Sequence, residues 1–247
     1  MSFKPDYIPE PQSLERKVFN EFELNILFNN LNWDMLFLRF FNLKKSQQEK
    51  INETKKEMDE IGKEIIAEKY LKAKGIYQIF KIKNYTDYIE LIENEKVIGR
   101  IEFNKTSNHL LSDFLADEDF LGVASVSVFI DEKKFQKLFE ERKYRKLYII
   151  NSISIMMAES FIEVLHYFVQ KNFKNEDEND FSKFPQYIQQ TKRYSPGYPS
   201  IDIKFNKTLH EVLKANEIGS KITESYMIEP ESSVQAIILH NPKAFYI

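Results

Sequence analysis

Three runs rich in β-branched and aromatic residues follow one another between residues 75 and 103, and very short turns separate them. The runs read GIYQIFKI, DYIELI and KVIGRIEF, with NYT and ENE between them. Connections this short join antiparallel neighbours, because a parallel pair needs a crossover of about a dozen residues or more. The run LGVASVSVFI at 121–130 adds another strand after a loop that contains SDFLA. The chain is therefore expected to build its core on an antiparallel sheet.

Helical patterns lie on both sides of these strands. The charged segment from Lys44 to about Lys74 carries apolar residues at helical spacing, which predicts a long amphipathic helix that ends at Gly75. Its charged residues are interpreted as a solvated face, with a docking surface as the alternative. A second helical region is expected from DEKKF to about Asn172. Strands followed by helices predict an α+β fold, an antiparallel sheet flanked by helices.

The two ends of the chain add shorter elements. Residues 1 to about 20 contain three prolines and are expected to form an extended lead-in. FPQYIQQT predicts a short helix, and Thr208-x-x-Glu211 resembles a capping box for the helix LHEVLKANEI, which Gly219 would close. The runs KITESYMI, SVQAIILH and FYI are expected to be strands.

Composition excludes several classes of function. A length of 247 residues with 43% hydrophobic and 14% aromatic residues can build a sizeable core. The net charge of -3 gives no overall attraction to polyanions, so nucleic acid is not expected as a partner. The chain has no cysteine, and it shows no signal-peptide pattern and no apolar run of about 20 residues. We therefore expect a soluble, cytoplasmic protein with no membrane partner.

The usual catalytic signatures are missing from the sequence. It has neither a GxGxxG nor a GxxxxGK[ST] motif, and its histidines accompany no Gly-x-Ser-x-Gly motif or cysteine. One helical face carries a polar stripe of Ser152, Glu159, Glu163, His166 and Gln170. Glu163-x-x-His166 matches half of a di-metal carboxylate site, but no second copy exists. We interpret the stripe as exposed surface or as the polar wall of a ligand groove. A metal site is the less favoured interpretation.

The stretch RYSPGYPSID at 193–202 concentrates residues that fix a backbone. Ser195-Pro196-Gly197-Tyr198 predicts a tight turn, because proline fixes φ and glycine accepts a positive φ. A stiff loop with Arg193 at its entrance and the rings of Tyr194 and Tyr198 beside it can receive a small, anionic, planar ligand. A plain turn between two elements is the commoner explanation of such a loop taken alone.

Several motifs together resemble the C-terminal activation domain of cobalamin-dependent methionine synthase. RYSPGYPS is similar to the PGYP turn of that family, with an arginine four residues before the glycine. KITESYMIEPESSV and HNPKAFYI resemble its Lys-Leu-Thr-Glu-Ser strand and its His-Pro-x-x-x-Tyr-Tyr ending, the latter shorter by one residue. The likeness continues upstream through Leu31-Asn32-Trp33, AEKYLKAKGI, SDFLA and MMAESFIEVLH, and it covers about residues 28 to 247. The resemblance therefore implies one domain at 28–247 after a lead-in at 1–27, with a bent antiparallel sheet flanked by helices.

This resemblance implies binding of S-adenosylmethionine in a groove along the sheet. The ligand would serve the reductive methylation of cob(II)alamin in methionine biosynthesis. The cobalamin would be carried by a partner, a cobalamin-dependent methionine synthase or a related corrinoid protein, and the electron would come from a flavodoxin-like donor. The chain would act as a stand-alone activation subunit of a methyltransferase system. It would bind and orient the ligand, and no catalytic residue is assigned.

The resemblance also implies ligand contacts at individual positions. Arg193 would hold the ligand carboxylate, Gly197 would allow close backbone approach, and Tyr198 would form an aromatic wall near the adenine or the sulfonium. Glu159 would supply an acidic contact. The remaining expected contacts are the loop residues Tyr194 and Ser195, the terminal Tyr246 or Phe245, and Asn32, which stands where the family has an aspartate, with Asp34 nearby.

Two alternatives remain at this point. The family's PGYPACPD continues here as PGYPSID, and Asn32 carries no charge. These departures favour a degenerate, non-catalytic binding module that recognises a corrinoid protein or another metabolite. A structural α+β protein with a coincidental PGYP turn is the third possibility.

Overall fold

The computed structural model describes residues 3–106, 109–177, 184 and 191–246. A seven-stranded sheet with the order β4-β3-β2-β5-β9-β6 forms its centre, and β1 pairs with β2. The strands are β1 (Lys17–Phe22), β2 (Leu71–Asn84), β3 (Tyr88–Glu93), β4 (Lys96–Glu102), β5 (Glu118–Ile130), β6 (Lys192–Tyr194) and β9 (Ser233–Leu239). Every pairing between these strands is antiparallel, which confirms the expected α+β class.

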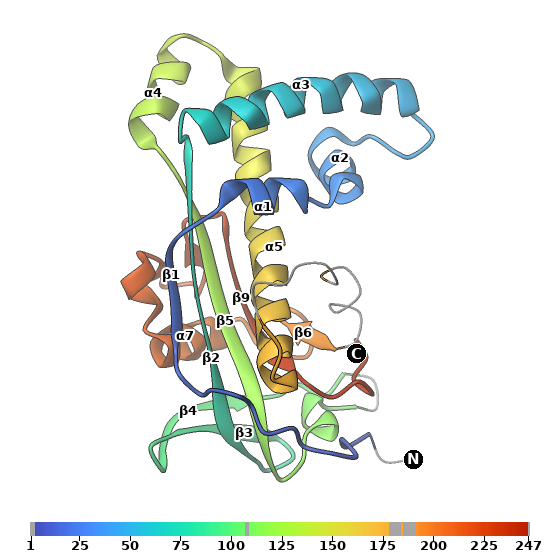
Figure 1. The fold of residues 1–247 in the computed structure, drawn as a ribbon, viewed down its shortest axis with the longest axis vertical. Coiled ribbons are helices and arrows are strands. Elements are labelled where there is room, and N and C mark those ends of the chain that lie inside the picture. Colours follow the sequence, from blue (N-terminus) through green and yellow to red (C-terminus); the bar gives the residue numbers. More distant parts are fainter. Residues whose placement is uncertain (1–2, 107–108, 178–183, 185–190, 247) are drawn as a thin grey trace.

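The two longest strands, β2 and β5, form the spine of the sheet (Figure 1). They pair without interruption from Leu71↔Ile130 to Lys83↔Glu118. Most residues of β5 are buried on both sides, because helices cover both faces of this part of the sheet. The small residues and valines of LGVASVSVFI suit that position, where strand and helices lie close together.

The helices divide between the two faces. They are α1 (Leu24–Asn29), α2 (Trp33–Phe41), α3 (Gln48–Ala67), α4 (Glu132–Glu140), α5 (Tyr144–Lys174) and α7 (Phe205–Leu213), with two 3-10 helices, η1 (Leu111–Phe114) and η3 (Ala215–Ile218). The core cluster on one face joins α5 with α1, α2 and α3, and the cluster on the other face joins α7 with η1 and η3. Figure 1 shows α5 along the length of the sheet and α3 lying across its upper end.

Helix α5 packs against the central strands of the sheet and against the helices α1 to α4. Among the described residues it is the one helix long and apolar enough to cross a membrane by length and composition alone, contrary to the expectation that no apolar run reaches that length. However, 78% of its most apolar window is buried inside the fold. Its apolar composition is therefore explained by its position between the sheet and the helices α1 to α4.

The predicted boundary between the charged helix and the first strand is wrong. Helix α3 ends at Ala67, and Leu71 to Lys74 belong to β2. Leu71 and Ala73 are buried while Lys72 is exposed, an alternation with the period of a strand. Gly75 does not end a helix but lies within β2, where Phe161 of α5 presses so closely that a Cβ atom would stand 2.7 Å from its ring.

Two helix boundaries in the second half also need correction. The helical region after DEKKF breaks between α4 and α5, where Arg142 has a φ of 58°. Helix α7 begins at Phe205, so Thr208 lies inside the helix and forms no capping box. Asp202 lies in the turn before the helix, where its Oδ1 accepts a hydrogen bond from the Lys204 amide at 2.8 Å.

The C-terminal strands are shorter than the sequence predicts. KITESYMI forms a separate hairpin of β7 (Lys221–Ile222) and β8 (Ile228–Glu229), because Thr223 and Met227 close a turn with Tyr226 at a φ of 63°. SVQAIILH is confirmed as β9, whereas Phe245 and Tyr246 are not in a strand. All of FPQYIQQT except its two end residues lies outside the described residues. In the expected lead-in, Lys17–Phe22 forms β1 and joins the sheet.

Candidate functional site

The stretch RYSPGYP leaves the edge of the sheet and closes on itself. In β6, Arg193 and Tyr194 pair with Ile238 and Ile237 of β9, so the sheet fixes the start of the loop. Gly197 has a φ of 96°, and its amide donates to the Ile201 carbonyl at 2.9 Å. The predicted turn is confirmed, and its glycine is required because an L side chain rarely adopts this φ. The loop therefore presents its side chains from a fixed backbone.

Arg193 faces the two carboxylates of the polar stripe on α5. One guanidinium nitrogen, Nη2, lies 3.5 Å from Glu159 Oε2 and 3.5 Å from Glu163 Oε1. Glu159 and Glu163 are four residues apart, so one helical turn separates them and both reach the same cation. Both distances are longer than a strong charge-assisted hydrogen bond. The guanidinium is therefore oriented by the two carboxylates without being clamped by either.

Two hollows meet at this ion pair, and both are lined by Glu159, Arg193, Ser195 and Tyr198. The first has a volume of about 420 Å³ and extends toward Met35 and Arg39 of α2 and toward the C-terminal end. The second has a volume of about 500 Å³ and extends toward the β7–β8 hairpin. The first is also lined by Tyr194, Pro199, Ser200 and Tyr246, and the second by Pro196, Ile203, Asn206, Thr223, Met227, Ile228, Glu229, Glu231, Ser233, Val234 and Gln235.

The tyrosines around the first hollow have different environments. Tyr198 and Tyr246 are 66% and 68% exposed, so their rings are free to cover a ligand. Tyr194 is buried and donates its hydroxyl to the Phe245 carbonyl at 2.7 Å, and burial raises the pKa of its hydroxyl. Its ring stands edge-on to that of Tyr246, with 5.6 Å between the centroids. Tyr194 therefore anchors the C-terminal segment that carries Tyr246.

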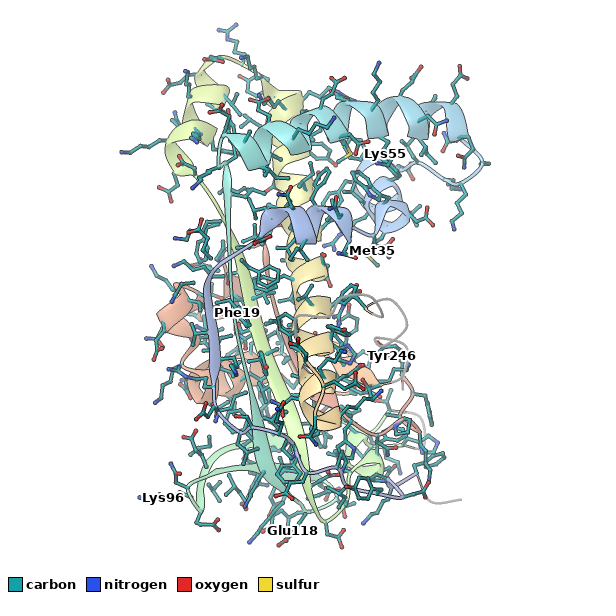
Figure 2. The ribbon with its side chains drawn as sticks, viewed as in Figure 1. Phe19, Met35, Lys55, Lys96, Glu118 and Tyr246 are labelled. Atoms are coloured by element: carbon teal, nitrogen blue, oxygen red, sulfur yellow. The ribbon has the colours of Figure 1, made fainter. Side chains whose placement is uncertain are left out.

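The structure distinguishes between the two C-terminal aromatic residues. Tyr246 lines the hollow, whereas Phe245 packs edge-on against Phe114 with the ring centroids 5.0 Å apart. Figure 2 shows Tyr246 of the C-terminal segment and Met35 of α2 on the same side of α5. The first hollow is thus closed by segments from opposite ends of the chain.

Asn32 has a different role from the other predicted contacts. Its side chain caps α2 by accepting a hydrogen bond from the Met35 amide at 3.0 Å, and it does not line either hollow. The nearby carboxylate of Asp34 pairs with Lys45 at 2.7 Å on the surface. Helix α2 instead contributes Met35 and Arg39, which sequence reasoning did not identify. Their spacing of four residues fits one helical face, but only the packing of α2 places that face over the hollow.

The rest of the polar stripe is buried. Nε2 of His166 lies 2.7 Å from Thr191 Oγ1 and 2.8 Å from Gln170 Nε2. Burial, assisted by the positive charges of Arg193 and Lys192, lowers the pKa of His166 to about 3. The imidazole is therefore neutral at physiological pH. Among the described residues, no group of three or more His, Cys, Asp or Glu side chains is placed to hold a metal ion.

Comparisons with known proteins agree on one relationship. The family model for the activation domain of vitamin B12 dependent methionine synthase matches residues 16–247. A methionine synthase from Mycobacterium leprae is 25% identical over 119 residues, which is 44% of this chain and 10% of the relative. The chain thus spans about a tenth of that relative's length. A crystal structure of the MetH reactivation domain bound to AdoHcy has the same fold, with a TM-score of 0.80, 24% identity, and coverage of 98% of this chain and 83% of that one.

Proposed function

The chain belongs to the family of vitamin B12-dependent methionine synthase activation domains, and on that basis we propose that it binds S-adenosylmethionine at Arg193 as an activation subunit. Its partner would be a cobalamin-dependent methionine synthase or a related corrinoid protein. The related MetH reactivation domain was crystallised with AdoHcy, which supports a ligand of this class. The proposal includes a cytoplasmic location and a role in methionine biosynthesis.

The observation that carries this proposal is the position of Arg193 where two hollows meet. Its guanidinium is only loosely held by Glu159 and Glu163 at 3.5 Å, so the planar fork can take a ligand carboxylate in a bidentate pair. Glu159 lines both hollows and is placed to attract the ammonium or the sulfonium of the ligand. The exposed rings of Tyr198 and Tyr246 offer faces for the adenine or the sulfonium cation.

In this proposal the chain contributes binding and orientation. S-adenosylmethionine supplies an electrophilic methyl group for reduced cobalamin held by the partner, and a flavodoxin-like protein supplies the electron. Arg193, Glu159 and the two tyrosines would hold the ligand so that its methyl group faces the open side of the hollow. The exposed side chains of Met35, Tyr198 and Tyr246 lie on that side, where a partner can approach. No proton transfer by the chain is required.

One observation favours a second candidate, a binding module that has lost the reactivation activity. The side chain of Asn32 is occupied by the helix cap, and Asp34 is occupied by Lys45, so neither lies in the hollow. An acidic contact to the ligand ammonium is therefore missing at this position. Loss of such a contact weakens binding by about tenfold or more. Such a module would still recognise a corrinoid protein or another metabolite.

Calorimetric titration of S-adenosylmethionine into the purified chain tests the first proposal directly. We expect saturable binding, a weakening of about tenfold or more in Arg193→Ala, and partial retention in Arg193→Lys, which keeps the charge without the fork. Arg145→Ala is the matched control, because Arg145 pairs with Glu57 on the surface and lines neither hollow. Absence of binding to the wild-type chain at millimolar ligand would contradict the proposal.

A methylation assay then separates the two candidates. The wild-type chain, S-adenosylmethionine, a chemical reductant and the cobalamin-binding portion of a methionine synthase are combined, and methylcobalamin is followed by its absorbance. Formation of methylcobalamin that depends on this chain supports the activation subunit. Ligand binding without methylation supports the binding module.

A further inference from the structure

Two carboxylates share one nitrogen of Arg193, but only one of them belongs to the ligand-binding surface. Glu159 lines both hollows, whereas Glu163 lines neither. Glu163 is nevertheless as close to Arg193 Nη2 as Glu159 is, at 3.5 Å. Glu163 therefore acts on a ligand through Arg193 and through its charge, without direct contact.

The charges around the two hollows do not balance. The charged residues that line them are the carboxylates Glu159, Glu229 and Glu231 and the cations Arg39 and Arg193. Among the described lining residues, three carboxylates therefore face two cations. Glu163 adds a further negative charge 3.5 Å from Arg193 Nη2. The site therefore carries surplus negative charge, to which Glu163 contributes.

The proposed ligand changes its charge when it reacts. S-adenosylmethionine carries an ammonium, a sulfonium and one carboxylate, which gives a net charge of plus one. When the methyl group leaves, the sulfur keeps the electron pair of the broken bond and becomes a neutral thioether, so S-adenosylhomocysteine has no net charge. A site with surplus negative charge attracts the cationic substrate more strongly than the neutral product.

We propose that Glu163 is a specificity-determining residue that makes the site prefer the cationic sulfonium ligand over its neutral thioether product. This inference rests on the proposed function. Glu163 lies outside both hollows and neutralises the positive charge of Arg193. The negative charge of Glu159 therefore remains available to the cationic part of the ligand. The preference favours exchange of product for substrate after each methyl transfer.

The test is the ratio of dissociation constants for S-adenosylhomocysteine and S-adenosylmethionine, measured by calorimetry at about pH 8 and low salt. We expect Glu163→Gln to weaken S-adenosylmethionine about three- to tenfold and S-adenosylhomocysteine by less than about twofold. Glu163→Asp keeps the charge and should keep a ratio close to that of the wild type. Glu140→Gln is the matched control, since Glu140 lies on α4 and is hydrogen-bonded only to Gln136 in its own helix.

The possible outcomes separate this inference from the proposed function. Binding of S-adenosylmethionine with an unchanged ratio in folded Glu163→Gln overturns the role of Glu163 and leaves the function standing. Failure of the wild type to bind either ligand overturns both. If Glu163→Gln does not fold, the wild-type ratio is measured from about 0.02 M to about 0.5 M salt. A ratio that falls as salt is added supports the inference, and a constant ratio overturns it.

Discussion

At the scale of single residues, one guanidinium nitrogen of Arg193 lies between two carboxylates, so the affinity for the proposed ligand is expected to depend on pH. Burial raises the pKa of Glu163 and the Glu159 charge adds to the rise, while Arg193 opposes it. Glu163 is therefore expected to take up a proton first as the pH falls. The ionisable groups that face it are Glu159 and Arg193, together with His166 and Lys192 beside them. His166, with a pKa of about 3, stays neutral throughout the range of the experiment.

Acidification should therefore reproduce the effect of Glu163→Gln. As the pH is lowered, we expect the preference for S-adenosylmethionine over S-adenosylhomocysteine to decline in the wild type, at a higher pH than for an unperturbed glutamate. The same titration of Glu163→Gln should give a flatter profile, because the group that gains the proton is absent. Calorimetry with both ligands at each pH provides the measurement. Identical profiles for the two proteins would show that another group titrates.

A second prediction at this scale concerns His166 and the stability of the fold. Its pKa is about 3 in the folded protein and 6.5 in its unperturbed state, so the unfolded chain binds the proton more tightly. The stabilisation is complete above the unfolded pKa and is lost as the pH falls toward the folded pKa. At pH 5 this loss reaches about 2 kcal/mol.

Urea denaturation of the wild type and of His166→Gln at about pH 7 and about pH 5 measures this contribution. The wild type should lose about 2 kcal/mol more than the variant over that interval. Between about pH 7 and about pH 8 the difference between the two proteins should stay constant, since His166 is neutral in both states there. An equal loss of stability in both proteins between about pH 7 and about pH 5 would exclude His166 as the source.

At the scale of elements, the fit between α5 and the sheet depends on glycines that the helix approaches closely. A Cβ atom added to Gly122 of β5 would stand 2.6 Å from Val169 Cγ1. We expect Gly122→Ala to lower the free energy of unfolding by about 1 to 3 kcal/mol, because the helix would have to move away from the strand. The second substitution Val169→Ala makes room for the methyl group and should recover part of the loss.

Thermal and urea unfolding of these variants gives the result, and β5 itself supplies a control. Ser125→Ala removes a buried hydroxyl that has no hydrogen-bond partner in the part of the chain that the structure describes, so it should change stability by less than about 0.5 kcal/mol. If Gly122→Ala were as stable as Ser125→Ala, the close approach of α5 to β5 would not constrain the strand.

The sequence predicts the long elements of this fold better than their ends. The runs at 75–103, 121–130 and 233–240 correspond to strands because β-branched and aromatic residues are concentrated there. The sequence pattern assigns the four residues from Leu71 to Lys74 to the helix. A short alternation of apolar and polar residues at the end of an amphipathic helix fits both the helical and the strand period. Pairing with β1 and β5 decides in favour of the strand. Such pairing is not visible in a local pattern.

In the candidate site too, local sequence patterns identify some residues, whereas the positions of others depend on tertiary packing. Arg193, Tyr198, Glu159 and Tyr246 were identified from motifs, and the structure brings all four around one hollow. Met35 and Arg39 could not be predicted, because their position depends on how α2 packs. The contact of Trp33 with Phe28 of α1, together with the buried Leu36 and Phe37, holds that helix against the core.

At the scale of the whole molecule, the hollow lies where distant parts of the chain meet. Its lining comes from α2, α5, β6, the loop after β6 and the C-terminal segment. The hydrophobic cluster on the α5 face of the sheet fixes α2 and α5, while the cluster on the other face includes Tyr194 of β6. The geometry around Arg193 therefore depends on both faces of the sheet. Three of its lining residues, Met35, Tyr198 and Tyr246, have large, exposed side chains and form its rim, as is expected of a surface that binds a partner.

This rim gives a prediction about docking of the cobalamin-binding partner. Leu38 is 56% exposed on α2, one turn from Met35, but it does not line the hollow. We expect Leu38→Asp to weaken the complex about tenfold or more, because a buried charge without a partner is costly at an interface. Binding of S-adenosylmethionine should remain unchanged, since the hollow keeps its lining.

The matched control is Val97→Asp on β4, where the side chain is 57% exposed at the edge of the sheet and away from the hollow. Both variants are titrated with the cobalamin-binding portion of a methionine synthase and, separately, with S-adenosylmethionine. Equal effects of the two substitutions on the complex would place the docking surface elsewhere. A loss confined to Leu38→Asp would place it at α2, from which the methyl group of a ligand held by Arg193 can be reached through the open side of the hollow.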